Sequence, residues 1–317
     1  MKKNNKILIT GGYGFVGTHF HKLLLRKGYK NIYREKSTSY DLSKIQDVKK
    51  LFDKVKPDYV FHFAAKVGGI LDNTLFPVDY YNKNILINLN IFECCKNFQV
   101  NKLINLGAGC GYPLNAKEPL REKNIWDGFP QSNSAPYSLA KKMLIIQSKS
   151  YKAQFNLDSI TIIPSNIYGP YDNFNLRSSH VIPALVRKFY EAKTQNLNEI
   201  EIWGSGKAKR DFIHAEDLVY GIYLLSKNYN DQEPINFAFG KQTSIKSVVN
   251  ELKKISGFKG KITWNLKYPE GQLSRQFSIK KMQKNLLNFN PKYNITNGLK
   301  NTYKWLSLNY DNPNTRL

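Results

Sequence analysis

The sequence is poor in acidic residues, in cysteine and in long apolar runs. Its 317 residues include 48 Lys and Arg against 24 Asp and Glu, a formal net charge of +24, and three cysteines. No run of about 18 apolar residues is present, which excludes a membrane-spanning helix, and the apolar run at residues 7–9 is too short for a signal peptide. Cys94 and Cys95 are adjacent and Cys110 stands alone, which excludes a disulfide framework or a zinc site. We expect a reducing, cytoplasmic compartment and no bound metal.

The shortage of acids raises the question of nucleic-acid binding. The lysines are spread along the chain, however, with four pairs and no long basic block, at 49–50, 141–142, 253–254 and 280–281. A nucleic-acid footprint is typically clustered on one face or in a tail. The pattern favours solvated lysines on helix surfaces, with a small anionic ligand as the alternative, and it predicts no nucleic-acid partner.

Short apolar runs alternate with helical apolar spacing over the first half of the chain. This alternation predicts an α/β, Rossmann-type, doubly wound parallel sheet. The predicted strands are residues 6–10, 31–33, 59–63, 102–106 and 159–164. The predicted helices are residues 18–26, 44–55, 78–97 and 137–155.

The alternation becomes irregular after about residue 170. We expect a dinucleotide-binding domain at residues 1–170, completed by parts of 213–242. Residues 171–212 and 243–317 then form a smaller, discontinuous α/β C-terminal substrate domain. Helices are predicted at 181–192, 215–227 and 244–256, and strands at 199–203 and 234–239. The end of the chain, 311–317, contains Pro and Asn and is expected to fray.

Three glycines follow the first predicted strand and open the first helix. Gly11 permits a tight turn, Gly14 lets the backbone approach a pyrophosphate, and Gly17 lets the helix pack close to the strand. In this position between strand and helix, the spacing predicts dinucleotide binding.

The residues after the second strand decide which dinucleotide is preferred. A basic residue there pairs with a 2′-phosphate, and an acidic one holds a ribose 2′-hydroxyl. Arg34 and Lys36 favour NADP, whereas Glu35 keeps NAD as the alternative. Asp41 and Leu42 are placed to meet the adenine.

Tyr137 and Lys141 are four residues apart on a predicted helix, so they share one face. A nearby ammonium favours the phenolate and is expected to lower the pKa of the phenol. The pair therefore predicts a proton donor beside a nicotinamide.

With these motifs the sequence resembles the extended short-chain dehydrogenase/reductases, and within them the GDP-L-fucose synthases, over residues 6 to about 275. The segments that carry the resemblance are residues 64–70, 106–107, Cys110 with 112–113, 136–141, 164–170, 172–174, 179–185, 203–206 and 210–212. The resemblance implies an NADP(H)-dependent epimerase/reductase of a GDP-4-keto-deoxysugar that serves surface-polysaccharide synthesis. It also implies a homodimer built through a four-helix bundle.

The resemblance assigns roles to particular residues. Cys110 and His180 occupy the positions that move protons at sugar carbons 3 and 5, and Tyr137 with Lys141 protonates oxygen 4. The GDP-sugar is implied to contact Cys110, Asn166, His180, Lys188, Trp203 and Arg210. The cofactor is implied to contact the residues already named for it, which are Gly11, Gly14, Gly17, Arg34, Lys36, Asp41, Leu42, Tyr137 and Lys141. It is also implied to contact Phe15, Val16, Ala64, Ala65, Lys66, Leu106, Gly107, Ala108, Pro164, Asn166, Ile167 and His180.

Two positions depart from the family. Ala108 stands where a Ser or Thr hydroxyl normally bonds the keto oxygen, and Ser278 stands where an Asp lies near the nucleoside. Losing one donor to a developing charge costs about 3 kcal/mol in barrier. A neighbouring residue or water replaces the hydroxyl, the reduction is slow, or the reaction differs. The alternatives are a 4-dehydrogenase, 4-reductase or epimerase of another GDP-sugar, such as a heptose, with tightly bound NAD, and a catalytically impaired sugar-nucleotide-binding protein.

Overall fold

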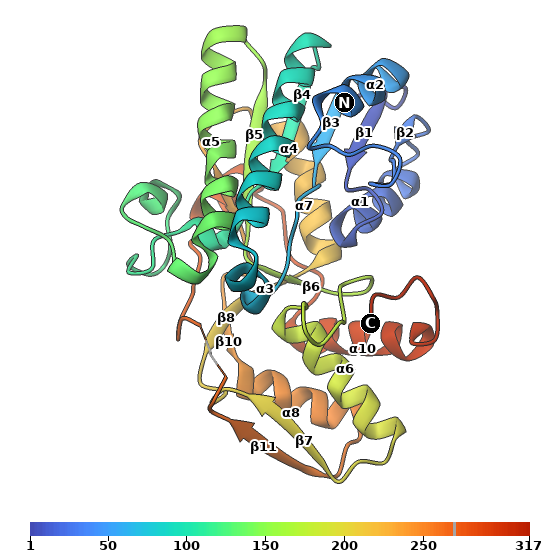
Figure 1. The fold of residues 1–317 in the computed structure, drawn as a ribbon, viewed down its shortest axis with the longest axis vertical. Helices are drawn as coiled ribbons and strands as arrows, with labels where there is room; N and C mark the ends of the chain where they lie inside the picture. Colours follow the sequence, from blue (N-terminus) through green and yellow to red (C-terminus); the bar gives the residue numbers. More distant parts are fainter. Residues whose placement is uncertain (269–270) are drawn as a thin grey trace.

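The computed structural model describes residues 1–268 and 271–317, and at Ile70, the last residue of the 64–70 motif, the backbone alone. A six-stranded parallel sheet lies in the upper lobe of Figure 1, in the order β2-β1-β3-β4-β5-β9. Its strands are β1 (Ile7–Thr10), β2 (Ile32–Tyr33), β3 (Tyr59–His62), β4 (Lys102–Leu106), β5 (Ser159–Pro164) and β9 (Ile235–Phe237). All residues of β1, β4 and β5 are buried. Strands buried on both sides require helices on both faces of the sheet.

Two hydrophobic cores confirm that arrangement. One core joins the sheet to α1 (Phe15–Arg26) and α7 (Ala215–Asn228). The other joins it to α2 (Ile45–Val55), α4 (Pro77–Asn97) and α5 (Ala135–Phe155). The sequence-based fold class, a doubly wound parallel α/β sheet, is therefore confirmed. In the described part of the chain, no helix is both long and apolar enough to cross a membrane.

A third core holds the lower lobe together. Helices α6 (Val181–Thr194), α8 (Ile245–Ser256) and α10 (Ile295–Asn309) pack there against a parallel strand pair, β7 (Glu199–Trp203) and β11 (Lys261–Asn265). A small sheet of β6 (Asn166–Tyr168), β8 (Lys209–His214) and β10 (Gln242–Ser244) lies between the two lobes (Figure 1). The short elements are α3 (Ile70–Leu75), α9 (Lys280–Asn285), and the 3-10 turns η1 (Gly109–Gly111), η2 (Glu122–Trp126) and η3 (Ser132–Ser134).

The end of the chain is tied down, so the expectation that it frays is wrong. The backbone carbonyl of Arg316 accepts a hydrogen bond from the Phe174 backbone N–H at 2.7 Å, and the Arg316 Nη2 donates to the Tyr171 carbonyl at 2.6 Å. Asn175 donates from its side chain to the Leu317 carbonyl at 3.1 Å. Contacts distant in sequence override the local tendency of Pro and Asn to leave the chain free. The tail thereby fixes the loop that leads to His180.

Candidate active site

The glycine turn between β1 and α1 forms a cradle that side chains would fill. Gly11 has φ +66°, and a Cβ there would lie 2.8 Å from the Ala64 backbone nitrogen. A Cβ on Gly17 would lie 2.2 Å from the Gly11 carbonyl oxygen. Gly14 is the N-cap of α1 and provides no side-chain cap, so the first N–H groups of the helix, at Phe15 and Val16, face the turn without one. These features fit a pyrophosphate at the positive end of a helix.

The residues after β2 give this cradle a positive side. The Arg34 guanidinium lies 4.2 Å from the Tyr13 ring centroid and donates to the Gly12 carbonyl at 3.3 Å. The Lys36 ammonium lies 5.9 Å from the same ring. Glu35 turns away to pair with Lys54 at 2.8 Å. Glu35, the residue that left NAD as the alternative, is thus paired with Lys54, whereas Arg34 and Lys36 lie beside the glycine turn.

The two residues predicted to meet the adenine are placed beside α4. The Asp41 carboxylate accepts two hydrogen bonds from Ser43, which lower the pKa of Asp41. The Leu42 carbonyl accepts from Asn90 of α4 at 2.9 Å. The Asp41 carboxylate is therefore already satisfied within its own loop.

Helix α5 places Tyr137 and Lys141 in its first two turns. Lys141 is only 4 % exposed, and burial lowers the pKa of its ammonium to about 8, opposed by the nearby Cys110. The Tyr137 ring packs edge-on against Tyr80, with 6.4 Å between centroids. Burial raises the pKa of Tyr137, and Cys110 and Tyr80 raise it further. The expectation that Lys141 lowers this pKa is therefore wrong, because desolvation dominates.

A buried polar network links α5 to β1, β3 and α4. The Thr10 hydroxyl lies 2.8 Å from His62 Nδ1, and His62 Nε2 lies 3.2 Å from Asn88 Oδ1. Asn88 donates to the Ala140 carbonyl at 3.0 Å. Because an amide oxygen only accepts, His62 carries its proton on Nε2 and is neutral. Burial, together with the charge of Lys141, lowers the pKa of His62 to about 3.

Cys110 lies in η1, directly after β4. Gly107 donates from its backbone to the Ile162 carbonyl at 2.8 Å, which fixes the start of the turn beside β5, and Leu106 pairs with Ile162 in the sheet. Ala108 is extended and contributes only a methyl group. Helix α5, which carries Tyr137 and Lys141, packs against η1, and Cys110 raises the pKa of both side chains.

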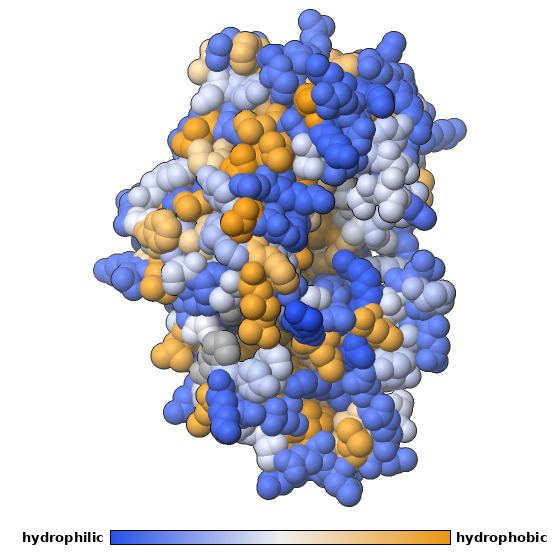
Figure 2. Space-filling model, viewed as in Figure 1, coloured by the Kyte–Doolittle hydropathy of each residue, from blue (hydrophilic) through white to orange (hydrophobic). Residues whose placement is uncertain are grey.

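His180 approaches from the lower lobe as the N-cap of α6. It is exposed to solvent, yet the surrounding protein still lowers its pKa through desolvation. Figure 2 shows the surface hollowed between the two lobes. The loop before His180 meets the loop after β3, where Gly69 donates to the Ser178 carbonyl at 3.1 Å.

The remaining residues expected at the cofactor follow β3, end β5 or belong to β6. Ala64 donates to the Thr10 hydroxyl at 3.4 Å and continues into Ala65. The Lys66 ammonium pairs with Asp79 at 2.6 Å. Pro164 ends β5, and Asn166 donates to the Asp211 carbonyl at 3.1 Å. Ile167 of β6 pairs with Ile213 of β8.

The expected substrate cations are not gathered in one cluster. Lys188 donates to the Glu201 carbonyl at 2.8 Å and lies 5.3 Å from the Trp203 ring centroid. Trp203 stacks on Tyr268, with 4.1 Å between centroids and 8° between planes. Arg210 lies on β8, the middle strand of the sheet between the lobes, and donates to the Lys209 carbonyl at 2.8 Å. Ser278 is buried, and its carbonyl accepts from Asn236.

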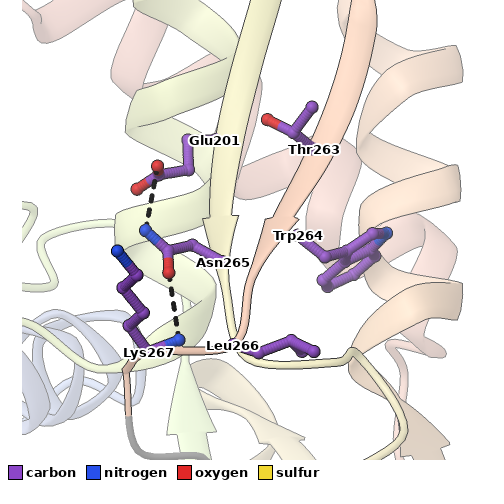
Figure 3. A pocket seen from close by; sticks show the side chains of 6 residues that line it. All are labelled: Glu201, Thr263, Trp264, Asn265, Leu266 and Lys267. Atoms are coloured by element: carbon purple, nitrogen blue, oxygen red, sulfur yellow. Dashed lines mark hydrogen bonds between the residues drawn. The ribbon is translucent and has the colours of Figure 1, made fainter.

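A hollow of about 490 Å³ lies at the end of β7 and β11 (Figure 3). It is lined by Glu201, Thr263, Trp264, Asn265, Leu266 and Lys267. The Glu201 carboxylate accepts from Asn265 at 3.0 Å on one side, and Trp264 lies on the other. This hollow is separate from the glycine turn and from the Tyr–Lys pair. Among the described residues, no group of three or more His, Cys, Asp or Glu is placed to hold a metal ion.

Sequence reasoning missed His62, Asn88, Tyr80 and Tyr268. Each of these residues makes its contact with a residue distant in the sequence, so no local spacing indicates that contact. The one usable signal in the sequence was His62 itself, a polar residue within an apolar strand, because a buried polar side chain needs a hydrogen-bond partner.

The parallel sheet, the glycine turn and the Tyr–Lys pair define a dinucleotide-binding α/β protein of the short-chain dehydrogenase type. The chain belongs to the NAD dependent epimerase/dehydratase family, whose model matches residues 7–240.

Individual relatives match over nearly the whole chain. GDP-L-fucose synthase 1 of Arabidopsis thaliana is 34% identical over 310 residues, covering 98% of this chain and 95% of the relative. The crystal structure of a GDP-L-fucose synthetase from Naegleria fowleri bound to NADP has a TM-score of 0.92 at 28% identity, covering 100% and 98% of the chains. MlghC, a GDP-mannoheptose C4 reductase from Campylobacter jejuni with NADP bound, has a TM-score of 0.87 at 30% identity, covering 97% and 99%.

Proposed function

We propose that this protein is an NADP-dependent epimerase/reductase of a GDP-4-keto-6-deoxyhexose. The observation that carries the proposal is the packing of η1, which carries Cys110, against α5, which carries Tyr137 and Lys141, on the protein that also bears the glycine turn. The family and the full-length relatives, among them a GDP-L-fucose synthase, support the same activity.

The glycine turn would hold the pyrophosphate of NADP, and Arg34 with Lys36 would hold its 2′-phosphate. Arg34 is preorganised for this, because the Tyr13 ring and the Gly12 carbonyl already orient its guanidinium. When bound, NADPH supplies the hydride that reduces carbon 4 of the sugar.

The protein's own residues move the protons. Protons on carbons 3 and 5 are acidified by the keto group at carbon 4, and Cys110 and His180 are the pair that removes and returns them. Desolvation lowers the pKa of His180, which favours the neutral imidazole, the form that accepts a proton. Tyr137 donates its proton to oxygen 4 as carbon 4 is reduced. The Lys141 ammonium then balances the charge left on the phenolate.

In the same proposal, Lys188, Trp203, Arg210 and Asn166 contact the GDP-sugar. Lys and Arg suit a pyrophosphate, and the Trp ring suits a flat base or sugar face. Trp203 and Lys188 already lie together, which supports one binding surface in the lower lobe. The Trp203 ring is stacked on Tyr268, so a base or sugar would pack on the other face of Trp203 or replace Tyr268.

A reductase that does not epimerise is the second candidate. Ala108 offers no hydroxyl to the keto oxygen, and the C. jejuni GDP-mannoheptose C4 reductase is a full-length structural relative. The two candidates differ in whether carbons 3 and 5 exchange protons with solvent.

One experiment separates them. The protein is incubated with GDP-4-keto-6-deoxymannose and NADPH in deuterated water, and the product is examined by NMR. Deuterium at carbons 3 and 5 with NADPH oxidation supports the epimerase/reductase. NADPH oxidation without deuterium supports the second candidate, and no turnover of this substrate refutes the first.

We also propose a homodimer formed through α4 and α5. These helices pack against each other, and their outer faces expose Tyr81, Leu86, Leu89, Ile146 and Phe155. Figure 2 shows hydrophobic residues gathered on the face where these helices lie. In a dimer, α4 and α5 of the two subunits would bury these exposed residues against each other in a four-helix bundle. Leu89→Asp should convert a dimer into a monomer in sedimentation analysis, and an unchanged mass would contradict this interface.

The wider assignments follow from the same reasoning. We propose a cytoplasmic enzyme of nucleotide-sugar synthesis for surface polysaccharide, consistent with three unpaired cysteines. We propose residues 1–170 with parts of 213–242 as the dinucleotide-binding domain, supported by β9 and α7 packing on the large sheet. Residues 171–212 and 243–317 then form the substrate domain.

A further inference from the structure

One asparagine folds the chain that leads from β6 to His180. The side-chain oxygen of Asn175 accepts hydrogen bonds from the backbone N–H groups of Arg177 at 3.0 Å and Ser178 at 3.2 Å. The Asn175 backbone carbonyl accepts from the N–H of the residue just before His180 at 2.9 Å. These bonds close a turn, which we define as the Asn175 turn, residues 175–179. The turn ends where His180 begins as the N-cap of α6.

The same side chain binds the end of the chain, which we define as the tail, residues 311–317. The Asn175 Nδ2 donates to the Leu317 carbonyl at 3.1 Å. Beside this bond, the Arg316 carbonyl accepts from the Phe174 backbone N–H at 2.7 Å. One amide therefore uses its oxygen on the Asn175 turn and its nitrogen on the tail. Because only an amide offers both an acceptor and two donors, neither a carboxylate nor a methyl group can replace both contacts.

The chain on either side of the turn is anchored by packing. Phe174, the residue before Asn175, is fully buried, and its ring stacks on Trp305 of α10 with 5.8 Å between centroids. The Phe174 carbonyl accepts from Arg187 of α6 at 3.3 Å. The chain before the turn and the helix after it are thus fixed to each other. The place of His180 between them therefore depends on the conformation of the turn.

We propose that Asn175 is a positioning residue for His180, which it holds at the start of α6 by closing the turn and by joining it to the tail. The inference rests on the proposed function, in which His180 exchanges a proton with the sugar. A base removes a proton only from within hydrogen-bond reach, so a small displacement of the imidazole slows the exchange. The glycine turn and Arg34 lie on other elements, so NADPH binding does not depend on Asn175.

Substitution of Asn175 tests the proposal in the full-length protein. With NADP⁺ bound, no hydride is available, and deuterium exchange at carbons 3 and 5 of GDP-4-keto-6-deoxymannose is followed alone. Asn175→Ala should slow this exchange about 10- to 100-fold and leave the affinity for NADPH nearly unchanged. Asn175→Asp keeps the oxygen that closes the turn and loses the donor to the tail, so its loss should be smaller. Asn314→Ala, at an exposed tail asparagine that donates to Asn312, is the matched control and should exchange at the wild-type rate.

A second readout needs no substrate. The chain has five histidines, and labelling of their imidazole Cε1 atoms with carbon-13 gives an NMR signal for each. His180→Gln identifies the signal of His180. In Asn175→Ala this signal should move or broaden, whereas the signal of His62, in the interior of the large sheet, should stay in place.

A folded Asn175→Ala protein that exchanges at the wild-type rate, or whose His180 signal is unmoved, would overturn the proposal. If this variant does not fold, Asn175→Asp decides: slowed exchange with a displaced His180 signal supports the proposal, and wild-type values contradict it. The two readouts also separate the hypotheses. Absence of exchange in the wild type refutes the proposed function, whereas the NMR signal judges the effect of Asn175 on His180 in either case.

Discussion

His62 and Asn88 share a hydrogen bond of 3.2 Å in the interior of the protein, and Asn88 extends it to the carbonyl of the residue before Lys141. The bond joins β3 to the helix pair α4 and α5. It therefore couples the sheet that would carry the dinucleotide to the helix that carries the Tyr–Lys pair.

Asn88→Ala should weaken both folding and catalysis. The variant leaves the His62 Nε2–H without an acceptor, which costs about 1–3 kcal/mol in unfolding free energy. The orientation of Lys141 loosens with it, so kcat should fall more than NADPH affinity. Denaturant unfolding and single-turnover kinetics measure these two effects. Asn97→Ala, at the exposed end of α4, is the control, and equal losses in both variants would contradict the coupling.

The neutral His62 should make the protein acid-sensitive. Its pKa is about 3 in the folded protein and 6.5 when unperturbed, so the folded state binds fewer protons than the unfolded state between these values. The contribution is fully present above about pH 6.5 and is lost as the pH falls towards 3. Relative to His62→Gln, the wild type should lose about 1–2 kcal/mol between pH 6.5 and pH 5. Parallel unfolding curves for the two proteins at both pH values would contradict this assignment.

Arg34→Ala should reduce the preference for NADPH over NADH. Removing one side of a charge-assisted phosphate contact costs about 1.5–3 kcal/mol, or roughly 10- to 100-fold in Kd for NADPH. NADH affinity should change little, because that ligand lacks the 2′-phosphate. Quenching of intrinsic fluorescence gives both Kd values without turnover. Glu35→Gln, which releases Lys54 instead, serves as the control, and an equal loss for both cofactors would show a structural role for Arg34.

Tyr137→Phe should retain the fold and NADPH binding but lose reduction. Without the phenolic proton, the rate of NADPH oxidation should fall about 10²–10⁴-fold. Deuterium exchange at carbons 3 and 5 should persist, since Cys110 and His180 carry it in the proposed mechanism. Loss of exchange together with reduction would place Tyr137 in the epimerisation step as well.

Ala108→Ser should accelerate reduction. The added hydroxyl offers a donor to the charge that develops on oxygen 4, and we expect kcat to rise at least about tenfold with little change in KM. Ala108→Gly changes the same position without a donor and should not accelerate the reaction. An unchanged rate in the serine variant would mean that another group already fills this role.

Much of the upper lobe was predictable because its signals are local. The run from Ile7 to Thr10 followed by three spaced glycines identifies a strand, a turn and a helix within a dozen residues. Tyr137 and Lys141 identify a helix face in the same way. The helix starts differ from expectation: α5 begins at Ala135 and α1 at Phe15, where Pro136 and the glycine turn suit a first turn.

The rest of the site depended on contacts between distant segments. Strands β6 and β10 have three residues each and pair with β8 from either side, so neither is long enough to show a period-two pattern in the sequence. Arg275 meets Gly109 across the fold, and desolvation of Tyr137 outweighs the ammonium four residues along its helix. Spacing in a sequence cannot express desolvation, which depends on everything packed around a group.

The discontinuous sheet also sets an order of events during synthesis. The outer edge of β5 has no partner until β9, some 70 residues later, has left the ribosome. An open strand edge is a template for unwanted association. The nascent chain therefore carries an unpaired strand edge while the roughly 70 residues between β5 and β9 are synthesised.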